Sequence, residues 1–109
     1  MEATLTQLVK LRTPIEAVGL ILPDDTVVEL ANRSDHPRDS FKLFGEDIIF
    51  VLQEYKFALT QETIEQTTLW HSHPSGGMGP STTDLKQKAP GLSHLVLTLS
   101  GDEVVPTWY

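Results

Sequence analysis

Two histidines and an aspartate lie close together in the segment LWHSHPSGGMGPSTTDL, residues 69–85. One residue separates His71 from His73, and ten residues separate His73 from Asp84. Two imidazoles and a carboxylate are typical ligands of a catalytic zinc ion, which keeps its fourth position for water. If residues 67–73 form a strand, side chains alternate between its faces and both imidazoles point the same way. The spacing therefore allows a metal site, although a bare His-x-His pair is more often two surface histidines on a half-exposed strand.

Ser81 and Asp84 also have a purely structural interpretation. Pro80 and Ser81 open a short helical stretch, and Ser81 precedes Asp84 by three residues, which is the spacing of a capping box. A capped helix explains both residues without a metal. It does not explain why this helix follows the histidine pair so closely. An aspartate in its first turn can point back toward the end of the strand and supply a third ligand.

A glutamate in an apolar segment is the candidate for acid–base chemistry. Glu16 lies in PIEAVGLIL, at the head of a β-rich run. Burying a lone carboxylate is costly unless it has a partner. Glu16 therefore lies either at an exposed strand end or beside the water that a metal would hold. Gly19, in the same run, allows a neighbouring backbone to approach closely.

Composition excludes several classes of site and partner. The chain has 109 residues, which predicts a single domain over residues 1–109. It contains no cysteine, which excludes disulfides, thiol catalysis and cysteine-based zinc or iron–sulfur sites. The formal net charge of −7 disfavours nucleic-acid binding. No apolar run is long enough to cross a bilayer and no secretory signal is evident, so we expect a cytoplasmic protein without membrane contact.

Hydrophobic periodicity predicts alternating helices and strands. The first two strands are expected to form a hairpin through Pro23-Asp24-Asp25. The order of elements indicates a mixed sheet flanked by helices, in an α/β or α+β layered sandwich. Helices are expected over residues 3–12, 45–59 and 81–89, and strands over residues 17–22, 26–32, 67–73, 94–100 and 103–109.

The other histidines and the tryptophans match no motif. His36 and His94 are interpreted as surface or strand-end residues, and Trp70 and Trp108 as packing residues. Two other families with related sites are excluded. Beta-lactamase-like hydrolases need Asp-His two residues after the histidine pair, where this chain has Ser75-Gly76, and zinc deaminases need a cysteine pair.

Taken together, these positions resemble the JAMM (JAB1/MPN/Mov34) metalloproteases. The segment Pro14–Ile21 reads P-x-E-x-x-G-L-I, and it is followed by H-S-H-P and P-S-x-x-D. The family signature has a glutamate well upstream, then His-x-His, ten residues and Asp, with a serine three residues before that Asp. Asn32 and Phe41 also resemble the family pattern after its second strand. The likeness extends from Leu5 to about Thr107.

The resemblance implies a cytidine-deaminase-like fold of α, β and α layers and a zinc-dependent peptidase or isopeptidase. It implies one zinc ion bound by His71, His73 and Asp84. It also implies that Glu16 is the general base and acid and that Ser81 helps to hold the oxyanion of the tetrahedral intermediate.

The resemblance further implies a protein or peptide substrate. Family members cut ubiquitin from its conjugates or cut after the terminal glycines of ubiquitin-like proteins, and others belong to phage tail-assembly proteins. A substrate tail of small residues would lie beside the loop Ser75–Gly79. The loops at 33–45 and 75–80 are short, which disfavours ubiquitin itself and favours a small enzyme of a bacterial or phage-infected cell. The alternative is a non-catalytic assembly module of the same fold; such members usually lack a ligand, and none is missing here.

Overall fold

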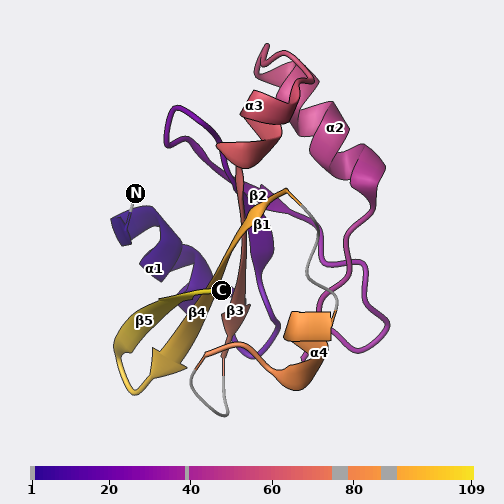
Figure 1. Ribbon diagram of the computed structural model, residues 1–109. Coiled ribbons are helices and arrows are strands. Elements are labelled where there is room, and N and C mark those ends of the chain that lie inside the picture. Colours follow the sequence, from indigo (N-terminus) through magenta and orange to yellow (C-terminus); the bar gives the residue numbers. More distant parts are fainter. Residues whose placement is uncertain (1, 39, 75–78, 87–90) are drawn as a thin grey trace.

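The computed structural model describes residues 2–38, 40–74, 79–86 and 91–109 (Figure 1). The strands form one mixed sheet, as the sequence predicts, and their order in it is β2-β1-β3-β4-β5. No helix in the described residues is long and apolar enough to cross a membrane. In chain order the elements are α1 (Glu2–Arg12), β1 (Val18–Ile21), β2 (Val27–Leu30), α2 (Gly45–Glu54), α3 (Gln61–Glu65), β3 (Thr68–His73), α4 (Thr82–Lys86), β4 (Ser93–Ser100) and β5 (Glu103–Trp108).

The sheet has one parallel pair of strands at its centre. β1 is antiparallel to both β2 and β3, β3 is parallel to β4, and β4 is antiparallel to β5. The predicted β1–β2 hairpin is confirmed, and its turn is closed by a 2.8 Å hydrogen bond from Leu22 N to Thr26 O. Pro106 lies within β5 at the edge of the sheet, where a residue without an N–H is tolerated. The connection from β3 to β4 contains α4, so this helix lies beside the end of β3.

Helices cover both faces of the sheet, which confirms the layered α+β class. Figure 1 shows α1 on one side and α2, α3 and α4 on the other. Each side has its own apolar cluster. The cluster on the α1 side contains Leu5, Val9, Ala17, Ile21, Trp70, Leu95 and Leu97. The cluster on the α2 side contains Val18, Leu20, Leu22, Val51, Leu52 and Leu69.

Gly19 in β1 has no side chain, and this lets the Trp70 ring of β3 and the backbone of β2 lie close to it. A Cβ atom at Gly19 would lie 2.7 Å from Cζ2 of Trp70 and would overlap the carbonyl oxygen of Val28. The close approach expected from the sequence is therefore present. It fixes Trp70, which is fully buried, and with it the register of β3 beside β1.

The helix expected over residues 45–59 is confirmed as far as Glu54 and is wrong beyond it. α2 ends at Glu54, and Lys56 adopts a positive φ of 64°, which does not continue a helix. A separate helix, α3, then begins after Thr60, whose hydroxyl accepts a hydrogen bond from Thr63 N. The sequence did not predict this helix. The helix expected over residues 81–89 is confirmed as far as Lys86, and residues 87–90 lie outside the described residues.

Two side-chain interpretations need correction. His94 is near the beginning of β4, as a strand-end residue should be, but it is only 1% exposed. Trp108 is 60% exposed on edge strand β5, so its interpretation as a packing residue is wrong. Trp108 lines a pocket together with Leu5 of α1 and Leu95 of β4, so these elements cover its ring only in part. Trp70 and the exposed His36 are placed as expected.

Candidate metal centre

The end of β3 presents two imidazoles on one face. His71 is fully buried, His73 is mostly buried, and their Nε2 atoms lie 3.2 Å apart. Ser72, between them, points to the other face, where its Oγ accepts a 2.8 Å hydrogen bond from Ala17 N. Ser72 N in turn donates to Ala17 O at 2.9 Å. The alternation predicted from the sequence is confirmed, and β3 is joined to the residue that follows Glu16.

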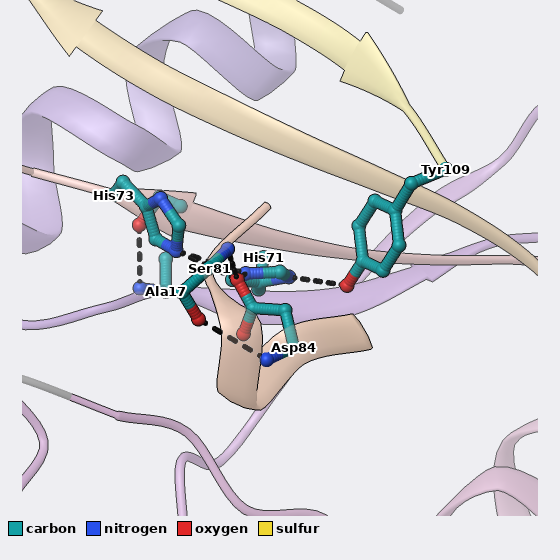
Figure 2. Close-up of polar contacts among 7 residues, drawn as sticks. Ala17, His71, His73, Ser81, Asp84 and Tyr109 are labelled. Atoms are coloured by element: carbon teal, nitrogen blue, oxygen red, sulfur yellow. Dashed lines mark hydrogen bonds and ion pairs between the residues drawn. The ribbon is translucent and has the colours of Figure 1, made fainter. Parts of the chain in front are cut away.

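Asp84, in the first turn of α4, completes the group (Figure 2). Its Oδ2 lies 3.1 Å from His71 Nε2 and 3.0 Å from His73 Nε2. The same Oδ2 accepts a 2.9 Å hydrogen bond from Ser81 N, while Asp84 N donates to Ser81 Oγ at 3.1 Å. This is the reciprocal capping arrangement expected from the sequence. The structural and metal-binding interpretations of Asp84 are therefore compatible, because the cap aims the carboxylate at the two histidines.

The three side chains fit a single metal ion. Their nearest ligand atoms form a triangle with sides of 3.0, 3.1 and 3.2 Å. Ligand atoms at about 2.0–2.1 Å from a tetrahedral zinc ion are separated by about 3.3–3.4 Å. Small outward movements of a few tenths of an ångström would produce that geometry. Two nitrogens and one carboxylate oxygen are also the donor set that zinc accepts in open sites.

Glu16 lies next to this triangle and is buried, with 5% of its surface exposed. Of the two alternatives that the sequence leaves open, the structure thus supports the buried one. Ligand atoms of Glu16, His71 and His73 all lie within 4.8 Å of one another. Glu16 therefore lies beside the two histidines. The four predicted acid and imidazole side chains are thereby brought together.

The backbone of Glu16 is fixed by the chain that follows β2. Glu16 N donates to Pro37 O at 2.7 Å, and Asn32 Nδ2 donates to Glu16 O at 2.9 Å. The side-chain oxygen of Asn32 accepts hydrogen bonds from the backbone N–H groups of Ser34 and Lys42. Asn32 therefore ties the loop after β2 to the beginning of β1. This gives a physical role to a residue that the sequence identified only through the family pattern.

Electrostatics favour the protonation states that bind a metal. Burial opposes ionisation of Asp84, but hydrogen bonds from His71 and from Ser81 N outweigh it and hold the pKa of the carboxyl well below its ordinary value. Burial, assisted by the neighbouring His71, lowers the pKa of His73. At neutral pH Asp84 is therefore an anion and His73 is a neutral imidazole. A carboxylate and a neutral imidazole are the forms that coordinate metal ions.

Sequence reasoning missed an aromatic residue that contacts the site. Tyr109 Oη lies 3.4 Å from His71 Nδ1, and the two rings meet edge to face (Figure 2). On another side of His71, the ring of Phe41 is stacked with a centroid separation of 4.3 Å. The separation of 38 residues between Tyr109 and His71 leaves no local signal. The only hint is that the last predicted strand ends on a polar aromatic residue.

Comparisons with known proteins identify the family and the fold. The family model for prokaryotic homologs of the JAB domain matches residues 1–108. The solution structure of protein DSY2949 from Desulfitobacterium hafniense has a similar fold, with a TM-score of 0.73 and 21% sequence identity over 98% of this chain and 77% of that chain. No curated protein matches the chain. The match of the family model over residues 1–108 shows that this chain belongs to the family of prokaryotic homologs of the JAB domain.

Proposed function

We propose that this protein is a zinc-dependent peptidase or isopeptidase of the JAMM type. The observation that carries the proposal is the convergence of His71, His73 and Asp84 on one point, with their ligand atoms 3.0–3.2 Å apart. Membership of the JAB-domain family supports it. A bound zinc ion would act as a Lewis acid and lower the pKa of a water ligand toward ~7.

Glu16 is the general base and acid in this proposal. Its buried carboxylate lies within 4.8 Å of the imidazole ligand atoms, within reach of a water placed between them. As a base it takes a proton from the attacking water, and as an acid it passes that proton to the departing amine. The leaving amine is the side chain of a lysine or an α-amino group. The hydrogen bonds of the Glu16 backbone to Pro37 and Asn32 hold the carboxylate in place during these transfers.

Ser81 is suited to stabilise the oxyanion. Its Oγ accepts a hydrogen bond from Asp84 N, so the hydroxyl proton is directed away from that N–H and can be donated to a substrate. Ser81 is exposed, although it directly precedes α4 and adjoins the ligand set. A donor fixed by a helix cap needs little reorganisation during the reaction, which is the property that oxyanion stabilisation requires.

A cleft beside the ligand set supports a peptide substrate. It has a volume of about 530 Å³ and is lined by Asp84 together with apolar side chains that include Phe41, Leu43, Ile48 and Tyr109. A cleft that combines apolar walls with polar groups such as Ser40 and Lys42 beside Asp84 suits a peptide segment. A tail ending in small residues, such as the Gly-Gly end of a ubiquitin-like protein, is the substrate class to test first. Residues 75–78 of the loop expected to contact that tail lie outside the described residues.

Cleavage of Gly-Gly-tailed fusion proteins tests the proposal. A panel of ubiquitin-like fusions is incubated with the zinc-loaded protein, with and without a chelator. We expect cleavage that the chelator abolishes and that added zinc restores. Zinc binding at one ion per chain without cleavage of any fusion would instead favour the non-catalytic assembly module.

Two variants assign the ligands and the base. Asp84→Ala should lose zinc, because it removes the only ligand that α4 provides in the described residues. Glu16→Gln should keep zinc and lose turnover by about 10²–10⁴-fold, because an amide cannot accept the proton of water. The reverse zinc contents would mean that Glu16, rather than Asp84, is the third ligand. Substantial turnover by Glu16→Gln would mean that another group is the base.

A further inference from the structure

The two ring nitrogens of His71 face different partners. Nε2 lies 3.1 Å from Asp84 Oδ2 and 3.2 Å from His73 Nε2, while Nδ1 lies 3.4 Å from Tyr109 Oη. An imidazole that coordinates a metal through Nε2 carries its proton on Nδ1. That N–H requires an acceptor, since a buried donor without one is costly. For His71, which is fully buried, the oxygen of Tyr109 is within reach of this role.

Tyr109 is itself held in place by β4. Its backbone N–H donates to His94 O at 2.9 Å, and its ring contacts the His94 ring with a centroid separation of 5.3 Å. His94 is 1% exposed, and its Nδ1 lies 3.0 Å from Leu92 O. These contacts fix the position of the Tyr109 side chain beside His71.

The ring of His71 is confined on two sides. Phe41 stacks on one face at 4.3 Å with an interplanar angle of 29°, and the Tyr109 ring stands at 89° to the imidazole. An imidazole confined in this way cannot easily exchange the positions of its two nitrogens. When Nε2 binds an ion, the hydroxyl of Tyr109 can accept the hydrogen bond of Nδ1–H, and the aromatic rings hold the plane of the imidazole.

We infer that Tyr109 is a positioning residue for the metal centre: it accepts the Nδ1–H hydrogen bond of His71 and so directs the Nε2 lone pair toward the ion. The inference rests on the proposed function, since it assumes that His71 is a ligand. Outer partners of metal-bound histidines fix the tautomer and the ring orientation, and their removal typically weakens metal binding by about 10–100-fold. The 3.4 Å separation places Tyr109 at the weaker end of that range.

The first test compares two tyrosine variants. Tyr109→Phe removes the hydroxyl and keeps the ring, and Tyr55→Phe makes the same change at a residue that is 46% exposed at the end of α2. Zinc dissociation constants are measured by competition with a chelating indicator. We expect binding to be about tenfold weaker for Tyr109→Phe and to be unchanged for Tyr55→Phe. Equal zinc affinity of Tyr109→Phe and the unchanged protein would overturn the inference.

A second readout separates positioning from a general structural effect. In zinc-loaded protein with ¹⁵N-labelled histidine, the Nδ1–H proton of His71 should exchange slowly with water and should exchange faster in Tyr109→Phe. The urea midpoint of the metal-free variant should match that of the unchanged protein, because the ring remains. A lower midpoint with an unchanged exchange rate would show a structural role and would overturn the inference. If the unchanged protein binds no zinc, the proposed function fails as well; if it binds zinc and only the Tyr109 effects are absent, the inference alone fails.

Discussion

The two faces of β3 are built differently, although their residues alternate along one strand. On the α1 face, Trp70 is fully buried against Gly19, and Ser72 exchanges hydrogen bonds with the backbone of Ala17. Each contact on this face is made within the sheet or to the apolar cluster beside it. On the opposite face, His71 and His73 contact each other, and both also contact Asp84 of α4 (Figure 2).

The difference indicates what each face contributes. Close packing on the α1 face fixes the register of β3, and such packing contributes to stability. On the other face, two imidazoles and a carboxylate lie 3.0–3.2 Å apart and are mostly withdrawn from water. Polar groups gathered in this way contribute less to folding than apolar side chains of the same volume, and such departures from apolar packing are typical of functional sites. Substitutions on the α1 face should therefore change stability, and substitutions on the site face should change zinc binding and turnover.

The largest effect is expected for Trp70→Ala. Removing a fully buried tryptophan side chain costs about 3–5 kcal/mol of unfolding free energy. Trp70→Phe should cost less, because it keeps a ring and removes an Nε1–H that has no hydrogen-bond partner among the described residues. Urea denaturation measures both. The folded fraction of each variant should still bind one zinc ion per chain, and loss of zinc from folded protein would contradict the separation of the two faces.

On the site face, Ser81→Ala should reduce turnover by about 10²–10³-fold, the effect of removing one oxyanion donor. It should also lower stability by about 1 kcal/mol, because the cap on Asp84 N is lost. Ser81→Thr retains a hydroxyl and should recover most of both. Zinc content and steady-state cleavage rates are the measurements.

Ser72→Ala is the matched control on the α1 face. It leaves the buried N–H of Ala17 without its acceptor, which costs about 1–3 kcal/mol of stability. Its turnover should fall far less than that of Ser81→Ala. Similar losses of turnover in the two variants would mean that Ser81 acts through the local fold rather than as a donor.

Much of the site follows from local rules that the sequence displays. Alternation along a strand places His71 and His73 on one face, and the serine and acid spacing of a capping box places Asp84 in the first turn of a helix. Both predictions concern residues a few positions apart, where backbone geometry determines side-chain direction. The buried environment of Glu16 was only one of two alternatives, because burial depends on the loop after β2 that packs against it.

Interactions between segments distant in the sequence could not be predicted from such local rules. Tyr109 meets His71 across 38 residues through the pairing of β5 with β4, and no periodicity reports such a contact. His94 has the sequence context of a strand end, yet the ring of Tyr109 packs against it. The break between α2 and α3 depends on a positive φ at Lys56. Lysine rarely adopts this conformation, so its presence in the sequence does not predict the break. Tertiary packing decided each of these outcomes.

The smallest expected effect is the pH dependence of the metal-free protein, and it should come from the site face. The folded-state pKa of His73 and that of Asp84 both lie below their ordinary values, so the unfolded chain binds more protons in acid. The stabilising contribution of each group is present above its unfolded pKa, about 6.5 for His73 and about 3.9 for Asp84. It is lost as the pH falls through the folded pKa.

Urea midpoints of the metal-free protein should therefore decrease from pH 7.5 to pH 5, and they should decrease further below about pH 4. In His73→Gln the first decrease should be smaller, because the glutamine side chain does not titrate in this range. His36→Gln is the control, since His36 is exposed and lies outside the ligand set. A decrease of equal size in His73→Gln and the unchanged protein would show that the titrating group is not His73. The proposed electrostatic difference between the two faces of β3 would then be contradicted.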